Sequence, residues 1–450
     1  MTSRSGRFFE WLSGHFAAMG SGASARLKPG GGPDRALCAM VLLLTAVGVV
    51  MVFSAGAAFA AKKYDDWTYL LKREVIYAAI GLFGFAVALR TDYSRYRRWA
   101  YPLLFVTVAL LAAVLLVGTR VNNASRWFRL GPLSFQPSEL AKLSLPLYLS
   151  LLLARKTEDV KTFTKGFLPP VLVTGLVVGL IVLQPDLGTT VILATVALAM
   201  MFVSGARMRY LFLAVLATAP VVWKVLITGK EWRMKRLLSF LDPWQYCRDF
   251  GYQLCESLIS VGSGGIFGQG LGAGRQKLFF LPEAHTDFIL AIIGEELGLV
   301  GTLALLLVFA VLILRGLLAA LRARDLFGSY LAFGITAIIA LQALANMAIV
   351  MGLLPTKGLT LPFVSYGGTS LVVSLFLAGI LGNISARNPE PHPAAVLRAI
   401  KRKRAVAKNR RQVRGPRIVV ELSPRPAPAG AAPSADARTE RDLVSPTPDP

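Results

Sequence analysis

Charged residues are scarce in this 450-residue sequence. Only 16% are Asp, Glu, Lys or Arg, whereas 54% are hydrophobic. Soluble domains usually contain about 25% charged residues. The mean hydropathy is +0.57, and the hydrophobic residues stand in runs of roughly 18 to 27 rather than at helical or strand spacing. The scarcity of charge therefore excludes an ordinary soluble globular protein and indicates a polytopic membrane protein.

Cysteine and histidine are also rare, with three of each. Cys38, Cys247 and Cys255 are too few for a disulfide framework, and no metal-ligand spacing occurs. If Cys247 and Cys255 share one helix, eight residues at ~1.5 Å each separate them by ~12 Å, which is beyond bridging range. We therefore expect free thiols. The histidines are scattered, so no histidine-based metal site is predicted.

Motifs of nucleotide-binding proteins and transporters are missing as well. The glycine-dense segment 262–277 contains no Walker lysine–hydroxyl pair, so its glycines predict close backbone approach to a ligand or to helices instead. No internal repeat indicates an inverted-repeat transporter. The net charge is +24. Because no nucleic-acid-binding module is present, we assign this surplus to membrane topology and to contacts with anionic lipid.

Ten hydrophobic segments are candidates for membrane-spanning helices. They are residues 36–60, 75–89, 101–118, 140–154, 169–183, 188–204, 210–228, 288–314, 328–354 and 364–384. Basic residues precede the first segment and follow the second, fourth, sixth, eighth and tenth, which places both termini in the cytoplasm by the positive-inside rule. The sequence thus predicts an all-α membrane protein with about ten transmembrane helices.

This topology divides the chain into regions of different character. A cytoplasmic segment (1–35) precedes the transmembrane domain (36–386), and a large external loop (about 229–286) joins helices 7 and 8. Residues 387–450 are basic and rich in Pro and Ala, which predicts a disordered cytoplasmic tail that rests on anionic lipid.

The external segment 281–288 has the most informative composition. Glu283, His285 and Asp287 lie where a polar loop meets a long apolar run. An acidic side chain there is costly unless it faces water, a partner or a substrate. Asp287 is therefore a candidate general base. The alternative is that Asp287 or Thr286 only caps the helix that follows.

Other external segments supply candidate substrate-binding residues. They are Arg126, Trp127, Arg129, Arg275, Lys277, Lys357 and Ser365, together with Glu283 and His285. Guanidinium groups suit phosphate. Trp127 has an alternative role as an interfacial anchor, and Lys357 as a solvated loop lysine.

Three acidic residues lie inside or beside apolar segments. Glu295 and Glu296 fall in the eighth hydrophobic segment, and Glu139 precedes the fourth. Carboxylates in such places need partners. We interpret all three as structural residues in ion pairs or hydrogen-bond networks.

Taken in order, the polar segments resemble the SEDS family (shape, elongation, division and sporulation) of membrane proteins. The resemblance covers roughly Arg35 to Arg387 and rests on residues 124–142, 184–189, 242–244, 251–276, 281–298 and 352–368. The form of residues 354–360 is closer to the division branch than to the elongation branch. Residues 246–250, Glu256 and Leu290 depart from the family's usual pattern.

The resemblance implies a peptidoglycan glycosyltransferase that polymerises lipid II, with undecaprenyl pyrophosphate as leaving group. The implied partners are a class B penicillin-binding protein and other division proteins, in the inner membrane at the division septum. The family's essential external aspartate falls on Asp287. Basic side chains or a divalent cation (Mg or Mn) would neutralise the pyrophosphate.

Three other functions stay open at this point. The chain could be a lipid II flippase, an elongation-type polymerase or a non-catalytic division scaffold. A flippase would need polar residues through the membrane midplane, where the sequence offers few besides Glu295, Glu296 and Asn346.

Overall fold

The computed structural model describes residues 32–121, 124–130, 133–156, 159–223, 235 and 238–386. The predicted tail (387–450) and nearly all of the predicted N-terminal segment (1–31) lie outside the described residues, as does part of the predicted external loop.

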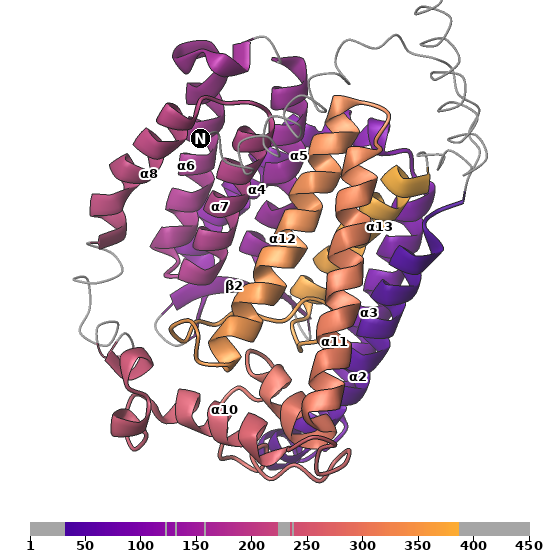
Figure 1. The fold of residues 1–450 in the computed structure, drawn as a ribbon, viewed down its shortest axis with the longest axis vertical. Coiled ribbons are helices and arrows are strands. Elements are labelled where there is room, and N and C mark those ends of the chain that lie inside the picture. The colour runs from indigo at the N-terminus through magenta and orange to yellow at the C-terminus, as the bar shows by residue number, and fades with distance from the viewer. Residues whose placement is uncertain are drawn as a thin grey trace, which may run out of the picture. The chain divides into compact units, whose positions relative to one another are not determined.

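Within the described residues, ten helices form a bundle (Figure 1). They are α2 (Arg35–Tyr64), α3 (Tyr69–Arg90), α4 (Tyr96–Val117), α5 (Pro137–Arg155), α6 (Leu168–Leu183), α7 (Leu187–Val203), α8 (Met208–Trp223), α11 (Ile289–Leu321), α12 (Leu326–Val350) and α13 (Thr369–Ala386). By length and composition, six of these are able to cross a membrane, namely α2, α4, α6, α11, α12 and α13, with α4 and α6 each extended by an adjoining turn. The prediction of an all-α polytopic membrane protein is confirmed.

The helices pack because each carries apolar residues all round, as helices buried in a bundle or in lipid do. In α2, for example, Leu37, Val41 and Leu44 are fully buried, whereas Leu42 and Leu43 on the other side are exposed. The closest pairings are α3 with α13, α11 with α12 and α2, and α5 with α4 and α12. The exposed apolar side chains are suited to contact lipid tails.

Ion pairs hold the helix ends together at one end of the bundle. Asp325, which caps the start of α12, pairs with Arg97 of α4 and accepts a hydrogen bond from Tyr93. Asp34, which caps α2, lies 3.5 Å from Arg315 near the end of α11. We call this the basic end, because the basic residues used in the topology prediction flank it.

The opposite end, here called the loop end, carries a small antiparallel sheet that the sequence did not predict. Its strands are β1 (Thr119–Val121), β2 (Ala124–Leu130) and β3 (Leu133–Phe135), in the order β1-β2-β3. Strands this short give little periodic signal. In Figure 1 the strand β2 lies below α6 and α7, and the loop helix α10 (Tyr252–Ser263) lies further down, in the lower part of the view.

The glycine-dense segment that follows α10 inserts into a break in α11. Gly298, with a φ of +67°, interrupts the helix, which favours glycine because that conformation crowds a Cβ. The N–H of Leu299 donates to Gly265, and the Glu295 carbonyl accepts from Gln269. The close backbone approach predicted for these glycines is therefore to a helix.

Cys247 and Cys255 form a disulfide, so the prediction of free thiols was wrong. Their Cα atoms lie 5.6 Å apart. The prediction assumed one helix, but Cys247 follows the short 3-10 helix Trp244–Tyr246, and the chain turns at Gly251 before α10 begins. Cys38 is free.

Replacing both Cys247 and Cys255 by serine should lower the free energy of unfolding by about 2 kcal/mol, because an eight-residue loop is no longer closed in the unfolded chain. Thermal unfolding of the purified protein would measure this loss. Reductant should lower the melting temperature of the unaltered protein and leave that of the double variant unchanged. Equal melting temperatures for the two proteins without reductant would contradict the prediction.

Candidate active site

A cavity of about 940 Å³ lies at the loop end of the bundle. It is bounded by β2, the first turns of α3 and α5, the turn between α6 and α7, the segment before α11, and the loop between α12 and α13. The predicted site residues that line it are Arg126, Trp127, Arg129, Glu139, Glu283, His285, Asp287 and Lys357. The fold thus gathers residues from segments far apart in the sequence.

The structure does not place Arg275, Lys277 and Ser365 in this cavity, although the sequence made them substrate-binding candidates. The Lys277 ammonium is 2.6 Å from Glu296. The backbone N–H of Arg275 donates to Glu295, and the Ser365 hydroxyl accepts from the N–H of Leu361. All three instead have contacts that hold loops in place.

Glu295 and Glu296 hold the glycine-dense loop against α11. Glu296 is fully buried and accepts hydrogen bonds from Lys277 and from Ser54 of α2. Glu295 accepts from backbone N–H groups of the loop and from Ser260. Buried carboxylates are tolerable only with such partners.

Asp287 lies in the cavity wall immediately before α11. The helix begins at Ile289 with Phe288 at the N-cap position, so the alternative in which Asp287 or Thr286 is the capping residue is wrong. The Asp287 carboxylate lies close to the loop between α12 and α13. A Cβ added to Gly358 of this loop would lie 3.1 Å from the Asp287 Oδ2 atom. A side chain at position 358 would therefore crowd the carboxylate.

His285, two residues before Asp287, packs among aromatic rings. Its ring centroid lies 4.9 Å from that of Phe59 and 5.8 Å from that of Tyr366, whose N–H donates to the His285 carbonyl. Burial lowers the pKa of His285, and although Glu283 opposes this shift, Lys63 adds to it. The imidazole is therefore held neutral.

Acidification should weaken the folded state through His285. Its pKa in the folded protein is below the ordinary value of about 6.5, so the unfolded chain takes up the proton first as the pH falls. The stabilising contribution is present above pH ~6.5 and is lost as the pH falls below it. The melting temperature should thus fall between pH 7.5 and 5.5 by more in the unaltered protein than in His285→Gln. Equal falls would contradict the prediction.

Arg126 attaches the sheet to the turn between α6 and α7. Its Nε and Nη2 atoms donate to the carbonyls of Gln184 and Pro185, at 2.8 and 2.6 Å. These hydrogen bonds engage the guanidinium, so Arg126 holds the cavity wall in place. Arg129, on the same strand, is exposed. The sequence could not distinguish the two.

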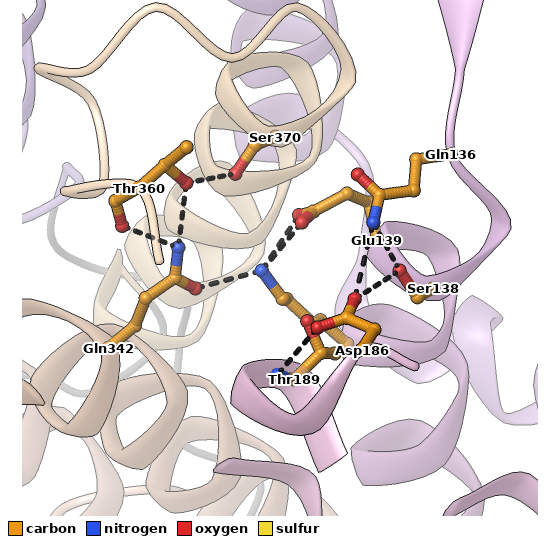
Figure 2. A network of polar contacts seen from close by, with 9 residues as sticks. Gln136, Ser138, Glu139, Asp186, Thr189, Gln342, Thr360 and Ser370 are labelled. Atoms are coloured by element: carbon orange, nitrogen blue, oxygen red, sulfur yellow. Dashed lines mark hydrogen bonds and ion pairs between the residues drawn. The ribbon is translucent and has the colours of Figure 1, made fainter. Parts of the chain in front are cut away.

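Glu139 was expected to have a structural ion-pair or hydrogen-bond partner, but its partner in a buried ion pair, Lys142, was missed. The Lys142 ammonium lies 2.7 and 2.9 Å from the two carboxylate oxygens of Glu139 and 2.9 Å from the Gln342 side-chain oxygen. Figure 2 shows this network, and both charged side chains are almost fully buried. The i,i+3 spacing of an acid and a base in an apolar segment was the signal that could have revealed it.

Asp186, in the turn between α6 and α7, accepts a second set of hydrogen bonds near this pair. Its carboxylate accepts from the N–H of Thr189 at the start of α7, and from the side chains of Ser138 and Gln136 at 3.3 Å (Figure 2). It thereby ties α7 to the start of α5. A single Asp between two apolar segments was its sequence signal.

The cavity has an excess of positive charge. Six basic residues line it against four acidic ones; the basic residues are Lys63, Arg73, Arg126, Arg129, Lys142 and Lys357. On the α3 side, burial raises the pKa of Tyr366 to about 12, so its hydroxyl stays protonated at neutral pH. Such a cavity suits an anionic ligand.

The described residues include no group of three or more His, Cys, Asp or Glu side chains that could hold a metal ion. Glu139 and Asp186 are already engaged by Lys142, Ser138 and Thr189. Glu283 and Asp287 are the other carboxylates that line the cavity, and no chemical step is assigned to a metal ion.

Fold and cavity together define a polytopic membrane protein with a polar, cation-rich site at one end of its helix bundle. The chain belongs to the cell cycle protein family of FtsW, RodA and SpoVE, which it matches over residues 34–390.

Similar proteins span nearly the whole helical region. The probable peptidoglycan glycosyltransferase FtsW of Trichlorobacter lovleyi is 46% identical over 355 residues, covering 78% of this chain and 93% of that protein. Stage V sporulation protein E of Bacillus subtilis is 42% identical, covering 78% and 97%. The solved structure of a peptidoglycan synthase complex contains a chain that is 31% identical, with a TM-score of 0.66, covering 80% and 99%.

Proposed function

We propose that this chain is a peptidoglycan glycosyltransferase that polymerises lipid II into glycan strands for cell division. The observation that carries the proposal is Asp287, a carboxylate in the wall of a cavity with six basic residues. Relatives named peptidoglycan glycosyltransferase FtsW support the reaction class. A pyrophosphate-linked substrate matches the charge of the cavity.

In the proposed reaction, a sugar hydroxyl of the acceptor attacks the anomeric carbon of the donor chain. The new bond forms between that oxygen and the anomeric carbon, and the bond from the carbon to the pyrophosphate oxygen breaks. Asp287 takes the hydroxyl proton as general base, an effect typically worth about 10²–10⁴-fold in rate. Undecaprenyl pyrophosphate leaves with the bonding electron pair.

The leaving group's charge is stabilised by basic side chains that line the cavity. Arg129 and Lys357 are the predicted candidates, and Arg73 is added by the structure. Lys142 faces Glu139, and Arg126 holds backbone carbonyls. Fixed cations at a developing anion need little reorganisation during the reaction.

The proposed setting is the inner membrane at the division septum, with both termini in the cytoplasm and the loop end outside. A disulfide in the loop-end segment supports this orientation, because disulfides persist in oxidising compartments. The proposed partner is a class B penicillin-binding protein, supported by the likeness to a chain of a peptidoglycan synthase complex.

Purified full-length chain, mixed with lipid II and a class B penicillin-binding protein, tests the proposal. The expected product is a ladder of glycan polymers, with undecaprenyl pyrophosphate released in proportion. A parallel assay measures lipid II movement across vesicles that contain the chain. Translocation without polymer would favour a flippase, and neither activity would favour a scaffold.

A further inference from the structure

Two buried amide side chains lie one helical turn apart on α12. Gln342 and Asn346 are 2% and 1% exposed, and their i,i+4 spacing puts them on the same face of the helix. Both face the loop between α12 and α13, which contributes Lys357 to the cavity. Burying two neutral amides costs free energy unless their hydrogen bonds are made.

Asn346 joins the segment that carries Asp287 to this loop. Its Nδ2 atom donates to the backbone carbonyl of Asp287 at 2.7 Å and to that of Leu359 at 2.6 Å. One amide group thus holds two chain segments separated by 72 residues in the sequence. Its Oδ1 atom is buried and has no hydrogen-bond partner among the described residues, so donation is what Asn346 supplies here.

Gln342 joins the next residue of the loop, Thr360, to the Lys142–Glu139 ion pair. Its Nε2 atom donates to the carbonyl of Thr360 at 2.9 Å, and its Oε1 atom accepts from the Lys142 ammonium at 2.9 Å. Figure 2 shows Gln342 between Thr360 and the Glu139 network. The two amides therefore bind consecutive carbonyls, those of Leu359 and Thr360.

We propose that Gln342 and Asn346 are positioning residues that fix Asp287 relative to the Lys142–Glu139 pair. This inference rests on the proposed function of the site. Helix α12 acts as the rigid spacer: Asn346 anchors the backbone of the general base, and Gln342 anchors the buried cation. The peptide 359–360, bound by both amides, fixes the loop that carries Gly358 against the Asp287 carboxylate. Gln342 lines the cavity, but neither amide is assigned a role as acid or base.

Losing these hydrogen bonds should lower the catalytic rate rather than weaken substrate binding. A general base must sit within hydrogen-bond reach of the proton that it removes, and a displacement of about 1 Å can cost about 10²-fold in rate. Losing the donor that holds the Asp287 carbonyl releases the base without altering its carboxylate. The substrate's contacts elsewhere in the cavity are retained.

The test uses substitutions that keep the approximate size of the side chain and remove its donor group. Asn346→Leu retains the approximate size of the side chain but cannot donate to the two carbonyls. Gln342→Glu retains the oxygen facing Lys142 and loses the donor to Thr360. Thr336→Val is the matched control, because Thr336 is a buried polar residue of α12 whose hydroxyl bonds only within its own helix, to Ala332.

With lipid II as substrate and the partner present, kcat should fall about 10- to 100-fold in Asn346→Leu, while KM changes less than about threefold. Gln342→Glu should show a smaller loss of the same kind, and Thr336→Val should retain normal kinetics. A normal kcat in Asn346→Leu, or a loss confined to KM, would overturn the proposal.

Amide hydrogen exchange provides a readout that does not depend on activity. In Asn346→Leu, peptides containing residues 285–290 and 357–361 should both exchange faster, and the Thr336→Val control should not change either. Faster exchange throughout the protein would mean general unfolding and would overturn the positioning role. An unaltered chain that makes no polymer would refute the proposed function, while the exchange result would still decide whether Asn346 holds both segments.

Discussion

Replacing Asp287 by asparagine is expected to reduce polymer formation from lipid II by about 10²-fold or more. Asparagine keeps the size of the side chain and its hydrogen-bonding capacity, but it cannot accept the proton that the acceptor hydroxyl releases. Because the backbone carbonyl of residue 287 is unaltered, its hydrogen bond from Asn346 remains. Folding and partner binding should therefore stay close to normal, and the loss should fall on kcat.

The measurement is polymer yield and rate for Asp287→Asn copurified with its partner, which shows that the variant is folded. Asp287→Glu should retain some activity, limited by the displaced carboxylate. Asp242→Asn is the matched control, because Asp242 is an exposed aspartate outside the cavity. Near-normal product from Asp287→Asn would remove Asp287 as general base, since the helix-cap explanation already fails on the position of Phe288.

The helices could be predicted because the bilayer imposes a local signal, a long apolar run for each span. Segment boundaries were less accurate: the tenth hydrophobic segment was predicted to begin at residue 364, whereas α13 begins at Thr369. The intervening residues, Val364 to Gly368, belong to the loop beside the cavity, and a hydropathy window that reaches into the apolar helix does not mark where the loop ends.

The sequence singled out Asp287 because a carboxylate stands where a polar loop meets an apolar run, and the structure places it in the cavity wall. Side-chain pairings between residues far apart in the sequence were not predictable. Lys277 is basic and near Asp287 in sequence, yet its charge is paired with Glu296. Lys142 meets Gln342, which is 200 residues away. The Cys247–Cys255 pair required knowledge of a chain reversal that no periodicity encodes.

Removing the Lys142 charge should have the second large effect. In Lys142→Met, the Glu139 carboxylate is left buried without its cation, and breaking one partner of a buried ion pair typically costs about 3–5 kcal/mol. The free energy of unfolding should fall by about this amount. Lys72→Met is the control, because its ion pair with Asp66 is exposed and should contribute little.

A double variant separates structural from functional roles of the pair. Combining Lys142→Met with Glu139→Gln removes both charges, so most of the lost stability should return, since neutral replacements of a buried pair are often tolerated. Polymerisation should nevertheless remain low, because Gln342 loses the ammonium that it faces across the cavity wall. If stability and polymer yield recover together, the ion pair serves packing alone, and the cations that act on the pyrophosphate must be sought among Arg73, Arg129 and Lys357.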